Sequence, residues 1–277
     1  MPPEPPLTAI SELPAQLRRD GWAVLDAASL ADLCGLTATA LPAFGPFWAD
    51  LPPDAHLLDG GRYRRRRHGC FTVEGATVAA VPPRAHWQPL EYNALHGGIE
   101  RWFQPLEPAM ASNPAWARLL CALAGVASTL RGSQRWFVEA HVFRIDTAGG
   151  IGRPTPEGAH RDGVDLVAVL MVARHRVKGG ETRVFEANGP QGVRFVLGEP
   201  WSVLLLDDKR VIHETTPIQP LDPAQPAWRD TLVLTFRRGG FQGPPATVSA
   251  ADPSDSESAV GTGDDARTHP HPRTLSA

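Results

Sequence analysis

Two histidines and one aspartate have the residue types and the spacing of a metal site. His160 and Asp162 are separated by a single residue, and His213 follows further along the chain. In an extended segment, residues i and i+2 project from the same face, so His160 and Asp162 can meet at one point. Two imidazoles and one carboxylate leave one side of a six-coordinate metal open, which suits non-haem Fe(II). The pattern predicts that His160, Asp162 and His213 bind iron and are the catalytic centre.

The sequence around these residues favours the metal site over a chance match. A short His-x-Asp motif also arises by chance, and the two side chains would then bond to the backbone of a turn. Each polar candidate, however, stands at one end of an apolar run of strand length: Asp162 before 166–172, His213 after 203–206, and Arg229 before 232–236. Strands of a β-barrel bring such residues together at the mouth of the barrel.

Composition and charge limit the class of protein. The chain has 277 residues, of which 42% are hydrophobic, enough for one large domain with a core. The net charge of −3 gives no reason to expect binding to nucleic acid or to an anionic membrane. No apolar stretch approaches the ~20 residues that span a bilayer. We expect no nucleic-acid or membrane partner, and the oligomeric state stays open.

Cysteine usage and the N-terminus predict a cytoplasmic protein. Cys34, Cys70 and Cys121 are widely separated and form no Cys-x-x-Cys pair. Such thiols are typical of a reducing compartment. The first residues, Met-Pro-Pro-Glu-Pro-Pro, have neither the basic start nor the apolar run of a signal peptide.

The chain divides into a short N-terminus, one domain and a tail. Residues 1–10 are rich in proline and are expected to be flexible, and residues 11–242 form the domain. Helices are predicted over 11–20, over 28–40, and from Pro114 onward, where Asn113 provides the cap.

From 135 to 238 short strands alternate with Gly, Pro and Asp turns, which predicts the core of a barrel. Residues 243–277 have almost no large apolar side chains and are predicted to be disordered.

A dense basic run at 62–68 allows three interpretations. It can bind nucleic acid, form a solvated strand, or place alternate arginines in a pocket, where a guanidinium can hold a carboxylate with two hydrogen bonds. In the last case either Arg64 and Arg66 or Arg65 and Arg67 face inward. We select Arg64 and Arg66 as candidate substrate-binding residues.

The strand predicted around residues 138–145 contributes two further substrate-binding candidates, His141 and Arg144. Structural roles are equally open to both of them. A serine-nucleophile elbow, a dinucleotide fingerprint and a P-loop are all missing from the sequence.

Several motifs together resemble those of the Fe(II)/2-oxoglutarate dioxygenases that include bacterial isoleucine 4-hydroxylase. The resemblance extends from about residue 18 to 238. Its motifs are His160-Arg161-Asp162-Gly163-Val164-Asp165, Gly179-Gly180-Glu181-Thr182, the run from Val211 to Pro217, the run from Trp228 to Phe236, and Tyr92-Asn93 with Gly97, Gly98 and Arg101.

The resemblance implies a mainly β fold with flanking helices, the double-stranded β-helix or jelly roll. It also implies Fe(II), with 2-oxoglutarate and O2 as co-substrates. The role of iron ligand falls to His160, Asp162 and His213, and Arg229 is matched to the residue that binds the far carboxylate of 2-oxoglutarate. Thr231 shares the strand face of Arg229 and adds a hydroxyl there. The alternative for Arg229 is a surface ion pair with Asp230.

The function expected from these residues is hydroxylation of a free amino acid or a similar small metabolite. A peptide or protein hydroxylase is the alternative within the same chemistry. A jelly-roll module that binds a metal or small molecule without catalysis is the alternative outside it. The retained Arg229 favours an enzyme, because a structural metal has no use for a residue that binds the co-substrate.

Overall fold

The structure is a computed structural model that describes residues 3–244. The predicted disordered tail of 243–277 therefore lies outside the described residues, apart from its first two. The N-terminus, predicted to be flexible over residues 1–10, forms backbone hydrogen bonds at two points: Val196 N donates to Pro3 O and Thr8 N to Val24 O. Within the described part of the chain, no helix has the length and apolar character needed to cross a membrane.

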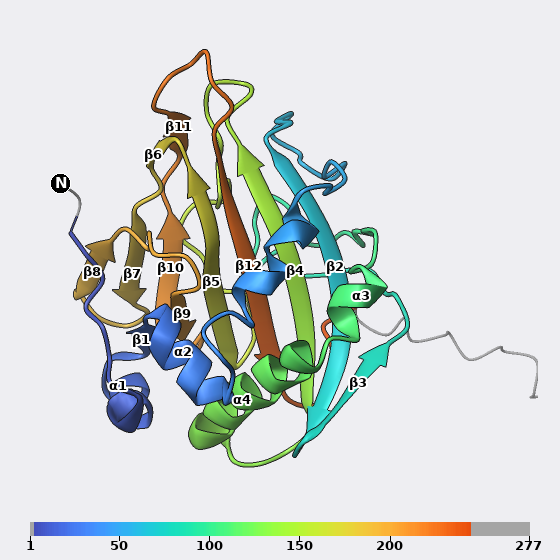
Figure 1. The fold of residues 1–277 in the computed structure, drawn as a ribbon, viewed down its shortest axis with the longest axis vertical. Coiled ribbons are helices and arrows are strands. Elements are labelled where there is room, and N and C mark those ends of the chain that lie inside the picture. Colours follow the sequence, from blue (N-terminus) through green and yellow to red (C-terminus); the bar gives the residue numbers. More distant parts are fainter. Residues whose placement is uncertain (1–2, 245–277) are drawn as a thin grey trace, which may run out of the picture. The chain divides into compact units, whose positions relative to one another are not determined.

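The larger sheet, at the centre of Figure 1, has seven antiparallel strands. It provides one wall of the cavity described below. In spatial order the strands are β1 (Trp22–Leu25), β9 (Val203–Leu206), β5 (Leu166–His175), β12 (Trp228–Arg237), β4 (Trp136–Asp146), β2 (Arg64–Glu74) and β3 (Thr77–Val81). The larger sheet thus contains three strands, β1, β2 and β3, that precede the barrel core predicted over 135–238. Of these, β2 pairs with β4 along ten residues.

Two smaller sheets complete the β structure. One contains β10 (Val211–Thr215), β7 (Thr182–Glu186) and β8 (Gly192–Phe195), and the other pairs β11 (Ile218–Pro220) with β6 (Val177–Gly179). The predicted mainly β architecture with flanking helices is confirmed.

Helices cover one face of the larger sheet (Figure 1). They are η1 (Ile10–Glu12), α1 (Leu13–Asp20), α2 (Ala27–Cys34), η2 (Pro42–Trp48), α3 (Pro108–Ala111) and α4 (Pro114–Arg131). The α4 start is as predicted, since Asn113 Oδ1 accepts a hydrogen bond from Ala115 N at 2.9 Å. The helix predicted over 28–40 is wrong at its end: Gly35 adopts the left-handed conformation, with φ of 60°, and terminates α2 at Cys34.

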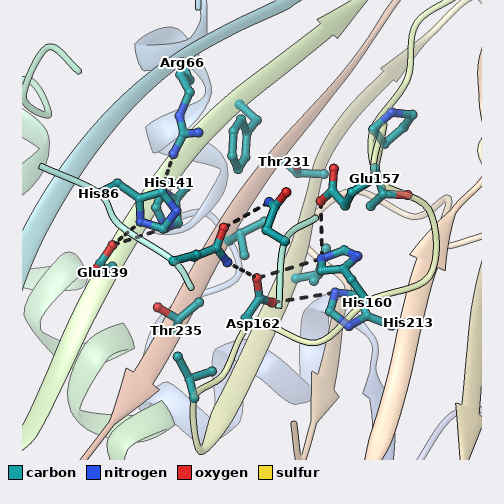
Figure 2. A pocket seen from close by; sticks show the side chains of 18 of the residues that line it. Arg66, His86, Glu139, His141, Glu157, His160, Asp162, His213, Thr231 and Thr235 are labelled. Atoms are coloured by element: carbon teal, nitrogen blue, oxygen red, sulfur yellow. Dashed lines mark hydrogen bonds and ion pairs between the residues drawn. The ribbon is translucent and has the colours of Figure 1, made fainter. Parts of the chain in front are cut away.

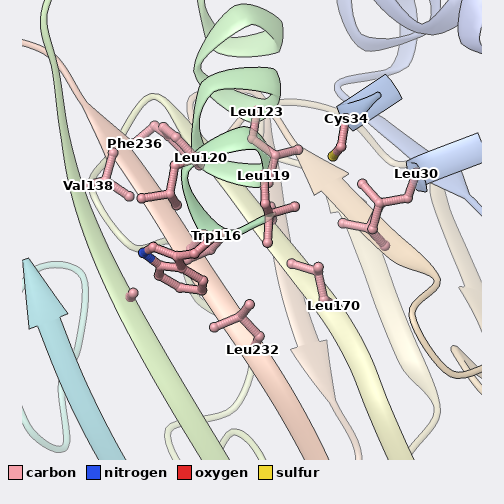
Figure 3. Close-up of a cluster of buried hydrophobic side chains, with 14 of the residues drawn as sticks. Leu30, Cys34, Trp116, Leu119, Leu120, Leu123, Val138, Leu170, Leu232 and Phe236 are labelled. Atoms are coloured by element: carbon pink, nitrogen blue, oxygen red, sulfur yellow. The ribbon is translucent and has the colours of Figure 1, made fainter. Parts of the chain in front are cut away.

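The main core lies between α4 and the larger sheet (Figure 3). Along β12 the even-numbered residues, Leu232, Leu234 and Phe236, are buried in this core. The odd-numbered residues of the same strand then point to the opposite face, because side chains of a strand alternate. Packing of α4 therefore fixes which residues of β12 face the cavity.

We predict that Leu120→Ala lowers the free energy of unfolding by about 2–5 kcal/mol, the usual cost of truncating a fully buried leucine. Leu120 is fully buried in the core against the sheet. Urea denaturation followed by circular dichroism measures the change. Leu221→Ala is the control, because Leu221 is 65% exposed, and a change below about 0.5 kcal/mol is expected there. Equal losses in the two variants would contradict this account of the core.

Candidate metal centre

A cavity of about 1050 Å³, counting its opening to solvent, lies on the sheet face opposite the main core. Alternate residues of three adjacent strands line it: Arg64 and Arg66 of β2, Glu139, His141, Phe143 and Ile145 of β4, and Arg229, Thr231, Val233, Thr235 and Arg237 of β12. The period of two follows from strand geometry.

His160, Asp162 and His213 come together at one wall of this cavity (Figure 2). His160 Nε2 lies 3.9 Å from Asp162 Oδ1, and His213 Nε2 lies 3.8 Å from Asp162 Oδ2. The two imidazole rings are 4.5 Å apart between centroids. Two nitrogens and a carboxylate at this separation fit one transition-metal ion with an open side.

The backbone that places the three ligands differs from the expected strand. His160 and His213 form a single β-bridge, with backbone N···O distances of 3.0 Å and 2.9 Å. Asp162 lies in a loop rather than on a strand, and so its direction does not follow from strand alternation.

Asp208 holds the loop that contains Asp162. Its carboxylate accepts hydrogen bonds from Asp162 N at 3.0 Å, Gly163 N at 2.8 Å and Val164 N at 3.0 Å. Gly163 has a φ of 76°, and a Cβ there would lie 2.5 Å from the Tyr92 ring, so glycine is required at this position. Burial and the nearby Asp162 charge raise the pKa of Asp208 to about 7.

Hydrogen bonding prepares His160 to bind a metal. Its Nδ1 lies 2.9 Å from Gly158 O and donates to it, which leaves the Nε2 lone pair directed at Asp162. Burial acts to lower the pKa of His160, but the Asp162 and Glu157 carboxylates outweigh burial and raise it. Burial, followed by the charge of His160, holds the pKa of His213 well below its usual value. The neutral form of His213 is the one that binds metals.

Gln88 orients the carboxylate of Asp162, a role that no motif in the sequence indicates. Gln88 Nε2 donates to Asp162 Oδ1 at 3.1 Å. The other end of the amide, Oε1, accepts from Asn93 Nδ2 at 3.1 Å and from Arg101 NH2 at 2.9 Å. With both ends bonded, the amide cannot turn over without losing hydrogen bonds.

We predict that Gln88→Leu lowers Fe(II) affinity by about 10- to 100-fold, the range typical for loss of a partner that orients a metal ligand. Titration of the purified protein with Fe(II) under anaerobic conditions measures the affinity. Gln104→Leu is the control, since Gln104 bonds to the outward-facing Arg67 instead. An unchanged affinity in the Gln88 variant would remove Gln88 from this role.

Arg229 and Thr231 line the cavity on β12, as expected for residues that bind the co-substrate. The Arg229 side chain is buried, and its Nε has no hydrogen-bond partner among the described residues. Burial, and then the like charge of Arg174, lower the pKa of Arg229 to about 9. The guanidinium is still charged at neutral pH and is available to a buried carboxylate.

The four candidate substrate-binding residues divide between the two faces of the sheet. Arg64, Arg66 and His141 line the cavity. Arg144 does not, and its prediction is corrected: its guanidinium binds Asp230 with two hydrogen bonds of 2.8 Å and 2.7 Å. Residues 141 and 144 differ by an odd number on one strand, so they point to opposite faces.

A cluster of three histidines and a glutamate, not indicated by the sequence motifs, lies near Arg66: His68, His86, Glu139 and His141. Figure 2 shows the last three beside Arg66. Glu139 Oε2 lies 3.0 Å from His68 Nε2 and 2.5 Å from His86 Nδ1. Arg66 NH2 donates to His141 Nδ1 at 2.6 Å, so the proton of neutral His141 is on Nε2. That proton would have to leave before Nε2 could bind a metal, and so the cluster is best described as a hydrogen-bonded network.

Comparison with known proteins identifies the family. Residues 45–235 match the model of the 2OG-Fe dioxygenase family. The chain belongs to this family. A bsmA homolog from Methylobium petroleophilum PM1 is 56% identical, over 86% of this chain and 97% of that chain, with a TM-score of 0.82. None of the curated proteins compared with the chain matches it.

Two solved structures of lower sequence identity share the fold. IDO from Bacillus thuringiensis is 17% identical, over 83% of this chain and 95% of that chain, with a TM-score of 0.66. The Fe(II)/(alpha)ketoglutarate-dependent dioxygenase TqaL is 21% identical, over 83% of this chain and 87% of that chain, with a TM-score of 0.63. The predicted jelly roll is confirmed.

Membership implies Fe(II), 2-oxoglutarate and O2, and the protein is a 2-oxoglutarate-dependent dioxygenase. The His, Asp and His donor set described above fits Fe(II).

Proposed function

We propose that the protein hydroxylates a free amino acid or a similar small metabolite. One oxygen atom of O2 enters the substrate as a hydroxyl group. The other enters succinate as 2-oxoglutarate loses CO2. Of the four electrons that reduce O2, two come from that decarboxylation and two from the C–H bond of the substrate that becomes C–OH. The observation that supports a small substrate is the cavity itself, since most of the side chains that line it between β2, β4 and β12 are buried.

Each part of the cavity has a task in this proposal. His160, Asp162 and His213 hold Fe(II), which supplies the activation of O2 when it is bound. Arg229 binds the far carboxylate of 2-oxoglutarate through charged hydrogen bonds, and the Thr231 hydroxyl adds a further contact.

The apolar residues of the lining keep bulk water from the reacting carbon. Val164, Val169 and Val233 line the cavity together with Phe137 and Phe143. An apolar enclosure strengthens the electrostatic interactions inside it and favours oxidation of the bound substrate over side reactions.

The alternatives predict different outcomes in one experiment. The Fe(II)-loaded protein is incubated with 2-oxoglutarate, ascorbate and each of the twenty standard amino acids, and succinate is measured together with the product mass. We expect succinate to form in step with a gain of one oxygen atom in at least one amino acid. Oxidation of peptides alone would favour the peptide or protein hydroxylase. No succinate with any amino acid or peptide would favour a binding module.

We also propose a cytoplasmic location. Cys34, Cys70 and Cys121 are all free thiols in the structure, which fits a reducing compartment. Cell fractionation of the source organism tests this, and recovery of the protein outside the cytoplasm would contradict it.

A further inference from the structure

Three buried arginines line the cavity and are largely without hydrogen-bond partners. Arg64, Arg66 and Arg101 are between 2% and 6% exposed. A guanidinium has five N–H donors. Among the described residues, each of these side chains donates to one partner only: Arg64 to Asp54, Arg66 to His141, and Arg101 to Gln88. The Nε atoms of Arg66 and Arg101 and one terminal nitrogen of Arg64 are buried and have no hydrogen-bond partner among the described residues.

Two of these arginines share one acidic partner. Arg64 Nε lies 2.7 Å from Asp54 Oδ2, and Arg66 NH1 lies 3.8 Å from the same oxygen, so one carboxylate serves two guanidinium groups. Glu139 and Glu157 also line the cavity, but the Glu139 Oε2 already accepts hydrogen bonds from two histidines. Burial, followed by the charge of Arg64, lowers the pKa of Arg101 to about 10. A buried guanidinium nitrogen without a hydrogen-bond partner is costly, and an incoming carboxylate would relieve that cost.

The geometry also fixes these side chains in place. The Arg66 guanidinium lies between two aromatic rings, 3.8 Å from the Phe103 centroid and 4.5 Å from the Phe143 centroid. Arg101 is fixed through Gln88. Guanidinium groups held in this way lose little entropy when they bind a carboxylate.

We propose that Arg64, Arg66 and Arg101 form a second carboxylate site, separate from Arg229, that binds the carboxylate of the substrate. This assignment rests on the proposed function, and it deepens it: the substrate is a free acid. An internal residue of a peptide has no backbone carboxylate to place there.

The site lies close to the iron ligands. Arg101 NH2 bonds to one end of the Gln88 amide, and Asp162 Oδ1 bonds to the other end, at 2.9 Å and 3.1 Å. Because two hydrogen bonds and one amide separate them, Arg101 NH2 and Asp162 Oδ1 lie at most roughly 8 Å apart. A small acid held at Arg101 therefore places carbons a few bonds from its carboxylate near the metal, which is the span of an amino-acid side chain.

Two molecules in this enzyme could supply the carboxylate bound at this site. One is the substrate, and the other is 2-oxoglutarate, which also carries a distal carboxylate. Arg229 lines the cavity on β12, whereas Arg64 and Arg66 lie on β2 with β4 between the two strands. The greater number of unused donors at the β2 side favours the substrate there. The experiment below separates the two sources.

Binding of a simple carboxylate tests the site without turnover. The full chain, kept free of metal with EDTA, is heated in the presence of isovalerate or of isovaleramide, which has the same shape without the charge. The Arg229→Met variant removes the other carboxylate site. In that variant, isovalerate at about five times its Kd is expected to raise Tm by about 2–4 °C. Isovaleramide is expected to leave Tm unchanged.

Arg66→Met in the same background should abolish the shift. Arg65→Met is the matched control, because Arg65 is the next residue of β2 but is 46% exposed in its side chain, and it should leave the shift intact. Equal shifts with acid and amide, or a shift that survives Arg66→Met, would overturn the site. If Arg66→Met unfolds the protein, the comparison of isovalerate with isovaleramide in the Arg229→Met variant still shows whether the remaining site requires a carboxylate.

The source of the carboxylate is decided by 2-oxoglutarate affinity, measured by calorimetry on the Mn(II)-loaded protein. Arg66→Met is expected to leave that affinity within about twofold and Arg229→Met to lower it by tenfold or more. A loss in the Arg66 variant would assign the site to the co-substrate and overturn the proposal. If isovalerate binds but no amino acid is oxidised, the proposed function fails and the site stands. If an amino acid and its amide are oxidised at equal rates, the proposed function stands and the carboxylate site fails.

Discussion

Alanine at His160, Asp162 or His213 is expected to abolish 2-oxoglutarate turnover and leave the fold intact. Each change removes one of three ligands to the metal, whereas partners that merely orient a ligand typically contribute 10- to 100-fold. We therefore expect a loss of more than about a hundredfold in kcat/KM. Succinate formation measures turnover, and anaerobic Fe(II) titration measures binding.

The fold should survive because none of the three side chains belongs to the main core. They lie at the wall of the cavity, beyond the sheet face that packs on α4. Asp162→Ala also removes a negative charge that acts on buried Asp208, which offsets part of the cost of losing the Gln88 bond. His175→Ala is the control histidine, since His175 stacks on Trp228 and does not line the cavity. Unchanged iron binding in all three ligand variants would show that the metal binds elsewhere.

The metal ligands were predictable from sequence because their types and short spacing form a motif. His160 and Asp162 are two residues apart, and His213 lies within a similarly recognisable run. Asp208 and Gln88 act on Asp162 from other parts of the chain. Asp208 accepts three backbone hydrogen bonds from residues 162–164, and the side-chain amide of Gln88 donates one hydrogen bond to the Asp162 carboxylate. An ordinary aspartate or glutamine in a turn gives no signal of such a role, because the contact exists only after folding.

The direction of the arginines in β2 illustrates a second limit. Sequence alone allowed Arg64 with Arg66, or Arg65 with Arg67, to face inward, because a shift of one residue exchanges the two faces of a strand. The register of β2 against β4, with His68 opposite His141, settles the choice. Arg144 was the opposite case. Alternation on one strand already places Arg144 on the other face from His141, so the sequence contained the information needed to reject it.

The fold followed from hydrophobic pattern where the elements were long. Asn113 and Pro114 marked the start of α4, and the apolar runs marked β5, β9 and β12. The part played by β2 was harder to predict. Four consecutive arginines, 64–67, do not look like a strand of the central sheet. They are accommodated because two of the four guanidinium groups enter the cavity and the other two point away from it.

Arg229→Ala is expected to raise the KM for 2-oxoglutarate by tenfold to more than a hundredfold. Charged hydrogen bonds contribute ~1.5–3 kcal/mol each, and one carboxylate can accept two from a guanidinium. Arg229→Lys should restore affinity only in part, since an ammonium cannot form the paired bonds. Initial rates at varied 2-oxoglutarate measure KM. Arg135→Ala serves as the control, because Arg135 forms an exposed pair with Glu74, and no change in KM is expected.

The structure removes the simpler explanation of Arg229 as half of a surface ion pair with Asp230. The Arg229 side chain is 3% exposed, and Asp230 is bound by Arg144 through both oxygens. Burial and the charge of Arg174 make the charged form of Arg229 unfavourable in the ligand-free protein. Arg229→Met should therefore keep or raise Tm without 2-oxoglutarate while it weakens 2-oxoglutarate binding. Loss of a residue that only stabilises the fold would lower Tm and leave 2-oxoglutarate binding unchanged. A fall in Tm of the ligand-free variant, with KM for 2-oxoglutarate unchanged, would therefore assign Arg229 a structural role.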